Sequence, residues 1–172
     1  MKSPAKYTVV AVLLLLAQGA LDNYVPLSVY LDISLCLFLL LALPVKWGTV
    51  PSMASGFVIG LLVDILGNGI IGMSSAAMTA AGLCRRGIFN ITAPKENEKR
   101  QSIDSLGLRS FMLYAAPLVV IYLAVYILLD SSGFRPVGFC LARLGISAAV
   151  NIVLTALLYV ISTGNSRKRR LR

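Results

Sequence analysis

Besides Arg85 and Arg86, which end the fourth apolar stretch, three charged residues lie inside long apolar stretches of the chain and are the first candidates for chemistry. These residues are Asp32, Asp64 and Arg143. A carboxylate or guanidinium group inside a membrane is costly unless it is paired or hydrogen-bonded, and such residues mark proton, ion or ligand sites. The order of the apolar stretches places all three in the outer half of the membrane. We therefore expect Asp32, Asp64 and Arg143 to form one cluster held by ion pairs.

Polar residues also recur every four positions in two of the apolar stretches. The two stripes consist of Arg143, Ser147, Asn151 and Thr155 in the last stretch and of Ser28, Asp32 and Cys36 in the second. Residues four apart share one face of a helix, so both stripes should point into a helix bundle. Two interpretations stay open at this point. The polar faces form either an internal clamp or a cavity that opens outward and receives a partner's helix or a small ligand.

A glycine motif leads into the second of the two aspartates. Gly56, Gly60 and Asp64 are four residues apart and lie on one helix face, and Gly72 follows shortly after them. Such a spacing lets two helices approach backbone to backbone, so we expect the three glycines to form a helix-packing or partner interface. Asp64 either hydrogen-bonds the Gly67–Gly69 turn and locks the adjoining helices together or serves as a proton- or ligand-binding carboxylate.

Several kinds of site are excluded by composition. The chain has no histidine, which removes His-based acid–base catalysis, Ser–His and Cys–His nucleophiles, and His metal sites. Cys36, Cys84 and Cys140 lie in three different apolar stretches without CxxC spacing, so we expect them to be small buried hydrophobes. We expect no catalytic residue, no metal and no cofactor, and therefore a protein that is not an enzyme.

The elements that must position these residues are long apolar helices. The apolar stretches span about residues 7–21, 27–44, 50–66, 70–91, 110–129 and 137–161. Each is close to the roughly 17–25 residues that a helix needs to cross a bilayer. The sequence therefore predicts an all-α membrane protein, a six-helix transmembrane bundle over residues 1–165 with a basic tail at 166–172.

The distribution of basic residues predicts the orientation of that bundle. Fourteen of the sixteen Lys and Arg residues lie on one side of the alternating stretches, and only Arg135 and Arg143 fall on the other. Short loops rich in Lys and Arg stay in the cytoplasm, so we expect six crossings of the bacterial inner membrane with both termini cytoplasmic. Arg85 and Arg86 should then anchor the cytoplasmic boundary. The net charge of +9 attracts anionic lipid headgroups, and basic residues beside membrane spans argue against nucleic-acid binding.

The N-terminus allows a second interpretation. A basic start, an apolar stretch and the small-residue sequence Ala17-Gln18-Gly19 resemble a cleavable signal peptide. Cleavage would leave five spans and move the new N-terminus outside. We expect retention, because proteins with several spans normally keep the first one as a signal anchor.

The third and fourth stretches carry a family resemblance. The segment Gly56-Phe57-Val58-Ile59-Gly60-Leu61-Leu62-Val63-Asp64-Ile65-Leu66, then Gly72-Met73, Arg85-Arg86 and Ala93-Pro94-Lys95-Glu96, resembles the MreD family of rod shape-determining membrane proteins, in particular its Bacteroidota form. The resemblance covers nearly the whole chain, and the GFxxGxxxD core is its diagnostic part.

The resemblance implies a function, a set of partners and a fold. The protein would be a non-enzymatic scaffold of the cell-elongation machinery that supports peptidoglycan synthesis during lateral wall growth. Its partners would be the single-span protein MreC and, with it, RodA and the penicillin-binding synthase. Contact with the cytoplasmic actin homologue MreB stays open. The implied fold resembles the S component of energy-coupling-factor transporters.

That fold also supplies an alternative function, a substrate-capture subunit of a vitamin or other small-molecule transporter. S components typically carry an Ala-x-x-x-Ala pattern on the first helix for docking their motor. The first stretch here, between Ala5 and Ala20, contains no such spacing, which disfavours this role. Recovery of partners from membranes would separate the two functions.

Overall fold

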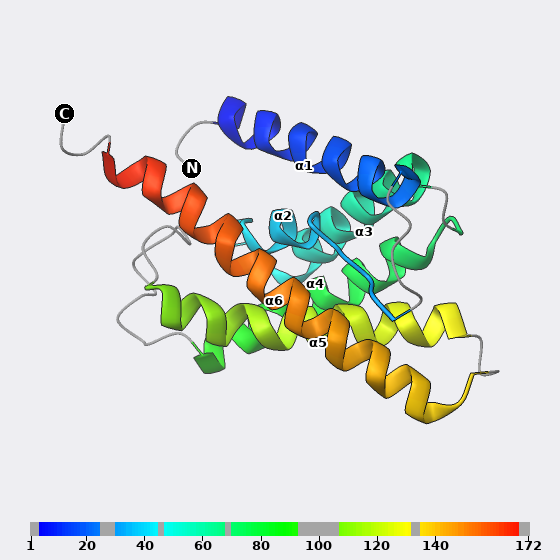
Figure 1. The fold of residues 1–172 in the computed structure, drawn as a ribbon. Helices are drawn as coiled ribbons and strands as arrows, with labels where there is room; N and C mark the ends of the chain where they lie inside the picture. Colours follow the sequence, from blue (N-terminus) through cyan, green and yellow to red (C-terminus); the bar gives the residue numbers. More distant parts are fainter. Residues whose placement is uncertain are drawn as a thin grey trace.

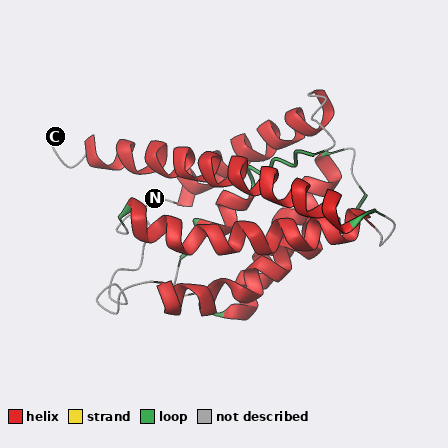
Figure 2. Ribbon diagram, turned by 60° about the horizontal axis from the view of Figure 1, so that its bottom comes forward, coloured by secondary structure: helices red, strands yellow, loops and turns green. Residues whose placement is uncertain are grey.

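The computed structural model describes residues 4–24, 30–44, 47–67, 70–92, 107–131 and 135–168. Its helices are α1 (Pro4–Tyr24), α2 (Leu37–Leu41), α3 (Thr49–Leu66), α4 (Met73–Thr92), α5 (Leu108–Ser131) and α6 (Val137–Lys168). Figure 1 shows their order, and Figure 2 shows helices and loops without strands in this described part of the chain. The expected all-α architecture is confirmed, and the described part of the chain has the expected number of six helices.

The chain is a multi-pass membrane protein by the length and composition of its helices. Within the described residues, four helices, α1, α3, α5 and α6, are long and apolar enough to cross a membrane. The fifth long helix, α4, is rich in Ala, Ser and Gly and carries Arg85 and Arg86. It packs between α3 and α5, so neighbouring helices cover much of its surface.

The expected single helix over residues 27–44 is wrong. Residues 31–34 have no regular structure, and α2 contains only five residues. The stripe of Ser28, Asp32 and Cys36 therefore does not form a helix face, and Ser28 itself lies outside the described residues. The physical reason is that side chains of α1 and α6 supply the hydrogen bonds that a helix would have made within itself. Irregular backbone is tolerated at membrane depth only where protein surrounds it.

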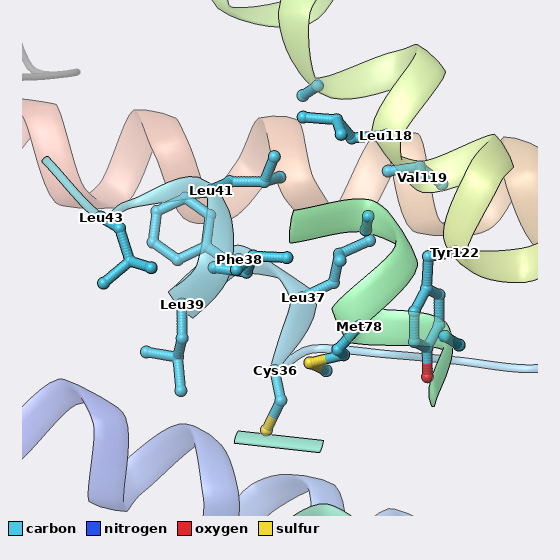
Figure 3. Close-up of a cluster of buried hydrophobic side chains, with 14 of the residues drawn as sticks. Cys36, Leu37, Phe38, Leu39, Leu41, Leu43, Met78, Leu118, Val119 and Tyr122 are labelled. Carbon is cyan, nitrogen blue, oxygen red and sulfur yellow. The ribbon is translucent and has the colours of Figure 1, made fainter. Parts of the chain in front are cut away.

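The core forms around α2. All five residues of this helix are buried, and they pack against α4 and α5 (Figure 3). Met78 of α4 and Leu118 and Val119 of α5 are fully buried beside it. On the outer surfaces of α1, α3, α5 and α6, large apolar side chains such as Leu13, Ile65 and Leu128 are exposed, as expected of helices that face lipid. The bundle thus encloses a short apolar helix and turns its long helices outward.

Candidate functional site

The glycine motif brings α3 and α4 into direct backbone contact. A Cβ atom added to Gly56 would lie 2.5 Å from the carbonyl oxygen of Met78, and one added to Gly60 would lie 2.4 Å from the Cα of Ser75. Both distances are far below van der Waals contact. Gly56 and Gly60 are therefore packed within the chain and are not exposed to a partner.

A third glycine of this contact has no obvious sequence signal. A Cβ atom on Gly82 of α4 would lie 2.8 Å from the carbonyl oxygen of Ser52 on α3. Gly82 follows a run of Ala, Ser and Thr residues, so its spacing did not distinguish it. Gly72, which we expected in the packing interface, has no atom within 4 Å of a built Cβ and adopts a φ of +109°. Its role is conformational, because L side chains rarely adopt this backbone geometry.

Asp64 caps the N-terminus of α4. Its Oδ2 atom accepts hydrogen bonds from the N–H groups of Gly72 at 2.9 Å and Ser75 at 3.2 Å, and its Oδ1 atom accepts one from Ser74 at 3.0 Å. A carboxylate at a helix N-terminus satisfies unpaired N–H groups and interacts favourably with the helix dipole. The expectation that Asp64 joins Asp32 and Arg143 is therefore wrong. The geometry favours the interpretation in which Asp64 locks α3 to α4.

Arg143 and Asp32 do lie together. The Nε and Nη2 atoms of Arg143 donate to the two carboxylate oxygens of Asp32 at 2.6 and 2.7 Å, a bidentate ion pair. Nη1 of Arg143 donates to Asp130, which lies at the end of α5. Arg143 is 7% exposed, whereas the side chains of Asp32 and Asp130 are 19% and 29% exposed. One guanidinium group thus holds two carboxylates at the end of the bundle, and we call these three residues the outer cluster.

The other polar residues of α6 bind the backbone of the extended segment. Ser147 Oγ accepts from the N–H of Asp32 at 2.9 Å, and Asn151 Oδ1 accepts from the N–H of Ser34 at 2.8 Å. Asn151 Nδ2 donates to the carbonyl oxygen of Asp32 at 2.6 Å. The polar face of α6 is therefore occupied by the protein's own chain, and Thr155 is buried on the same face.

Gln18 of α1 completes this arrangement from the opposite side. Its Oε1 atom accepts from the N–H of Leu35 at 2.8 Å, and its Nε2 atom donates to the carbonyl oxygen of Ile33 at 2.9 Å. Gln18 is a single polar residue in an apolar stretch and forms no periodic pattern. Only the free-energy cost of burying its amide group could have marked it as a structural residue in the sequence.

Arg85 is a buried residue and not a boundary anchor. It is 3% exposed, whereas Arg86 beside it is exposed. Its Nε donates to Tyr114 Oη at 2.8 Å, its Nη1 donates to Ser52 Oγ at 3.1 Å, and its Nη2 donates to the carbonyl oxygen of Leu43. No carboxylate forms an ion pair with Arg85 within the described ranges. Arg85 thereby joins α3, α4, α5 and the end of the segment that contains α2.

The remaining candidates for chemistry are the cysteines and possible metal ligands. The three cysteines are free, with Cys36 buried and Cys84 and Cys140 partly exposed. Over the described part of the chain, no group of three or more Cys, Asp or Glu side chains could hold a metal ion. The polar side chains just described bind one another and the chain's own backbone.

Comparison with known proteins adds no relative to this geometry. No family model, no curated protein and no solved structure matches the chain. Function must therefore be inferred from the residues and contacts themselves.

Proposed function

We propose that the protein is a non-enzymatic membrane scaffold of the cell-elongation machinery that binds MreC and supports peptidoglycan synthesis. The observation that carries this proposal is the structural role of the GFxxGxxxD core in joining α3 to α4. Gly56 and Gly60 set the α3–α4 contact, and Asp64 caps α4 at the end of the same contact. The residues that resemble the MreD family thus act as one structural unit, as expected for a motif that defines a fold.

The bonding of the polar residues also supports a scaffold. Arg143, Asp64 and Arg85 all bind groups of the same chain. What the bundle presents outward is mainly apolar helix surface on α1, α3, α5 and α6. Such surfaces suit lipid and the transmembrane helices of partners, including MreC and, with it, RodA and its penicillin-binding partner.

The proposed location is the bacterial inner membrane with both termini in the cytoplasm. The basic residues between the spans support this orientation. Arg85 lies near the start of α5, whereas Asp130 lies at the end of the same helix. The Arg85 site would then face the cytoplasm, where MreB is a candidate partner, and the outer cluster would face the periplasm.

A transporter subunit that captures a small molecule is the second candidate. The partial exposure of Asp32 and Asp130 favours it, because two carboxylates at one end of a bundle could bind a cationic ligand. The contacts of Ser147 and Asn151 weigh against it, since the polar face of α6 already holds the backbone of this chain.

Recovery of partners from membranes separates the two functions. The chain, carrying an affinity tag, is purified from native membranes in a mild detergent, and co-purifying proteins are identified by mass spectrometry. We expect MreC, together with RodA and its penicillin-binding partner. A Gly60→Leu variant should lose these partners, and a Gly87→Leu variant on α4, where nothing lies within 4 Å of a built Cβ, serves as the matched control. Recovery of an ATPase motor module without MreC would overturn the scaffold in favour of the transporter.

A further inference from the structure

Residues 30–35, which we call the strap, are held like a β-strand, although no strand lies beside them in the part of the chain that the structure describes. Asp32 and Ser34 direct their backbone N–H groups to Ser147 and Asn151 of α6. Leu35 and Ile33 direct their backbone groups to Gln18 of α1. Successive residues of the strap thus direct their backbone groups alternately to α6 and to α1, as expected of extended backbone. Figure 1 shows the strap as the extended blue segment that leads into α2.

The extended form of the strap depends on side chains that are remote in sequence. The bonds from α6 connect residues 115 to 119 positions apart. Backbone groups inside a membrane must be satisfied, and without these side chains an extended strap would leave its N–H and C=O groups unpaired. A helix satisfies them locally. The apolar stretch of residues 27–44 is also long enough for one.

Both ends of the segment that contains the strap are anchored. At the outer end Arg143 holds the side chain of Asp32, and at the other end Arg85 holds the carbonyl group of Leu43. Extended backbone rises about 3.3 Å per residue and a helix about 1.5 Å, so helix formation over residues 32–35, the part of the strap between the two anchors, would shorten the segment by roughly 7 Å. With Leu43 held, this shortening would pull Asp32 away from Arg143.

We propose that the strap is a conformational switch with two states. In the docked state it is extended between α1 and α6, and Asp32 completes the outer cluster. In the released state α2 lengthens toward its N-terminus, Asp32 leaves the cluster, and Arg143 retains Asp130 alone. The two states differ in which groups satisfy the same backbone atoms. This proposal concerns the chain itself and does not depend on the proposed scaffold function.

A distance measurement between two spin labels tests the switch in the full-length protein. The labels are placed on Leu31→Cys in the strap and Leu128→Cys at the outer end of α5, after the native cysteines Cys36, Cys84 and Cys140 have been replaced by alanine. Pulsed electron–electron double resonance spectroscopy in detergent micelles then reports the distance between the labels. Release moves residue 31 away from the outer end of the bundle, so the distance should lengthen by several ångströms, up to roughly 9 Å.

Removal of the docking bonds should populate the released state. The test variant is Ser147→Ala/Asn151→Ala, and its matched control is Ile146→Ala/Val153→Ala, at two exposed positions of the same helix. We expect a longer, narrow distance peak in the test variant only. An unchanged distance in the test variant would overturn the switch. A broad distribution without a second peak would show a disordered strap and would also overturn it.

A milder substitution covers the case in which the double variant does not fold. The Ser147→Ala variant removes a hydroxyl that accepts from the N–H of Asp32 and donates to the carbonyl oxygen of Tyr30, and it keeps Asn151. Its population at the longer distance should exceed that of Ile146→Ala by at least about threefold, since one interhelical hydrogen bond in a membrane changes a two-state equilibrium by roughly this factor. Equal populations in these two single variants would contradict the proposal.

Discussion

At the contact between α3 and α4, one added carbon atom decides whether the two helices can pack. The helical period placed Gly56, Gly60 and Asp64 on one face, because residues four apart share a face in any α-helix. The period could not identify the opposing atoms, which are backbone atoms of Met78 and Ser75. Spacing therefore predicted which residues share a face, whereas the tightness of the contact required the structure.

The first prediction is that a single methyl group at Gly60 destabilises the protein. Gly60→Ala would bring a Cβ atom within 2.4 Å of the Cα of Ser75, so α3 and α4 must move apart. We expect a loss of about 1–3 kcal/mol, typical of overpacking, and a lower thermal midpoint in detergent. Gly87→Ala on α4 is the control, since nothing lies within 4 Å of its built Cβ. An equal effect at both positions would contradict close packing at Gly60.

A second prediction concerns the partner of Arg143. Arg143→Leu leaves Asp32 partly buried without its guanidinium group and should cost about 3–5 kcal/mol. Arg143→Leu combined with Asp32→Leu removes both charges and should recover part of that loss. Arg143→Leu combined with Asp64→Leu should instead show additive losses, because Asp64 bonds α4 and not Arg143.

Both double-mutant cycles for Arg143 are measured by thermal stability in detergent. Stability should recover in the double variant that includes Asp32→Leu and not in the one that includes Asp64→Leu. If the Asp64 combination also recovered stability, the two aspartates would be coupled after all and the separation of the two sites would be wrong. Asp130 is retained in every variant, so its contact with Arg143 affects both cycles equally.

At the scale of elements, apolar length predicted the positions of the long helices but not the form of the second segment. The helices α3 and α5 begin and end close to the expected apolar stretches, since lipid favours helices over any other open structure, whereas α6 begins at the expected residue and continues past residue 161 to Lys168. Residues 31–34 remain extended because the side chains of Gln18, Ser147 and Asn151 form hydrogen bonds with backbone N–H and C=O groups of this segment. These three partners are remote in sequence from residues 31–34, so the local sequence alone could not predict the extended form.

Arg85 supplies the third prediction, which concerns the joining of elements. Arg85→Lys keeps the charge but loses the planar fork of donors that reaches Ser52, Tyr114 and Leu43 at once. Hydrogen bonds to charged groups are each worth about 1.5–3 kcal/mol, so we expect a marked loss of thermal stability and of folded protein recovered from membranes. Arg86→Lys is the matched control, because Arg86 is exposed. Tolerance of Arg85→Lys at the level of this control would show that charge alone suffices there.

At the scale of the whole molecule, sequence and structure agree on a helical membrane bundle, and the resemblance to S components remains a prediction. Four of the helices could cross a membrane by themselves, whereas α4 depends on its neighbours α3 and α5 for cover. Two polar sites mark the ends of the bundle, Arg85 at one end and Arg143 at the other. Charge counting had already assigned opposite sides to the loops near these residues, because basic loops are retained in the cytoplasm.

The last prediction is that both termini of the whole molecule lie in the cytoplasm and that the first helix is retained. A reporter that is active only in the periplasm, fused after Arg172, should be inactive, whereas the same reporter inserted after Arg135 should be active, because Arg135 is one of two basic residues on the sparsely charged side. Cleavage near Ala17 would remove Tyr7, whose hydroxyl donates to the carbonyl oxygen of Leu39 at 3.0 Å. An intact mass equal to that of a chain beginning at Ala20 or Leu21 would show such cleavage. Activity of the reporter fused after Arg172 would reverse the proposed orientation.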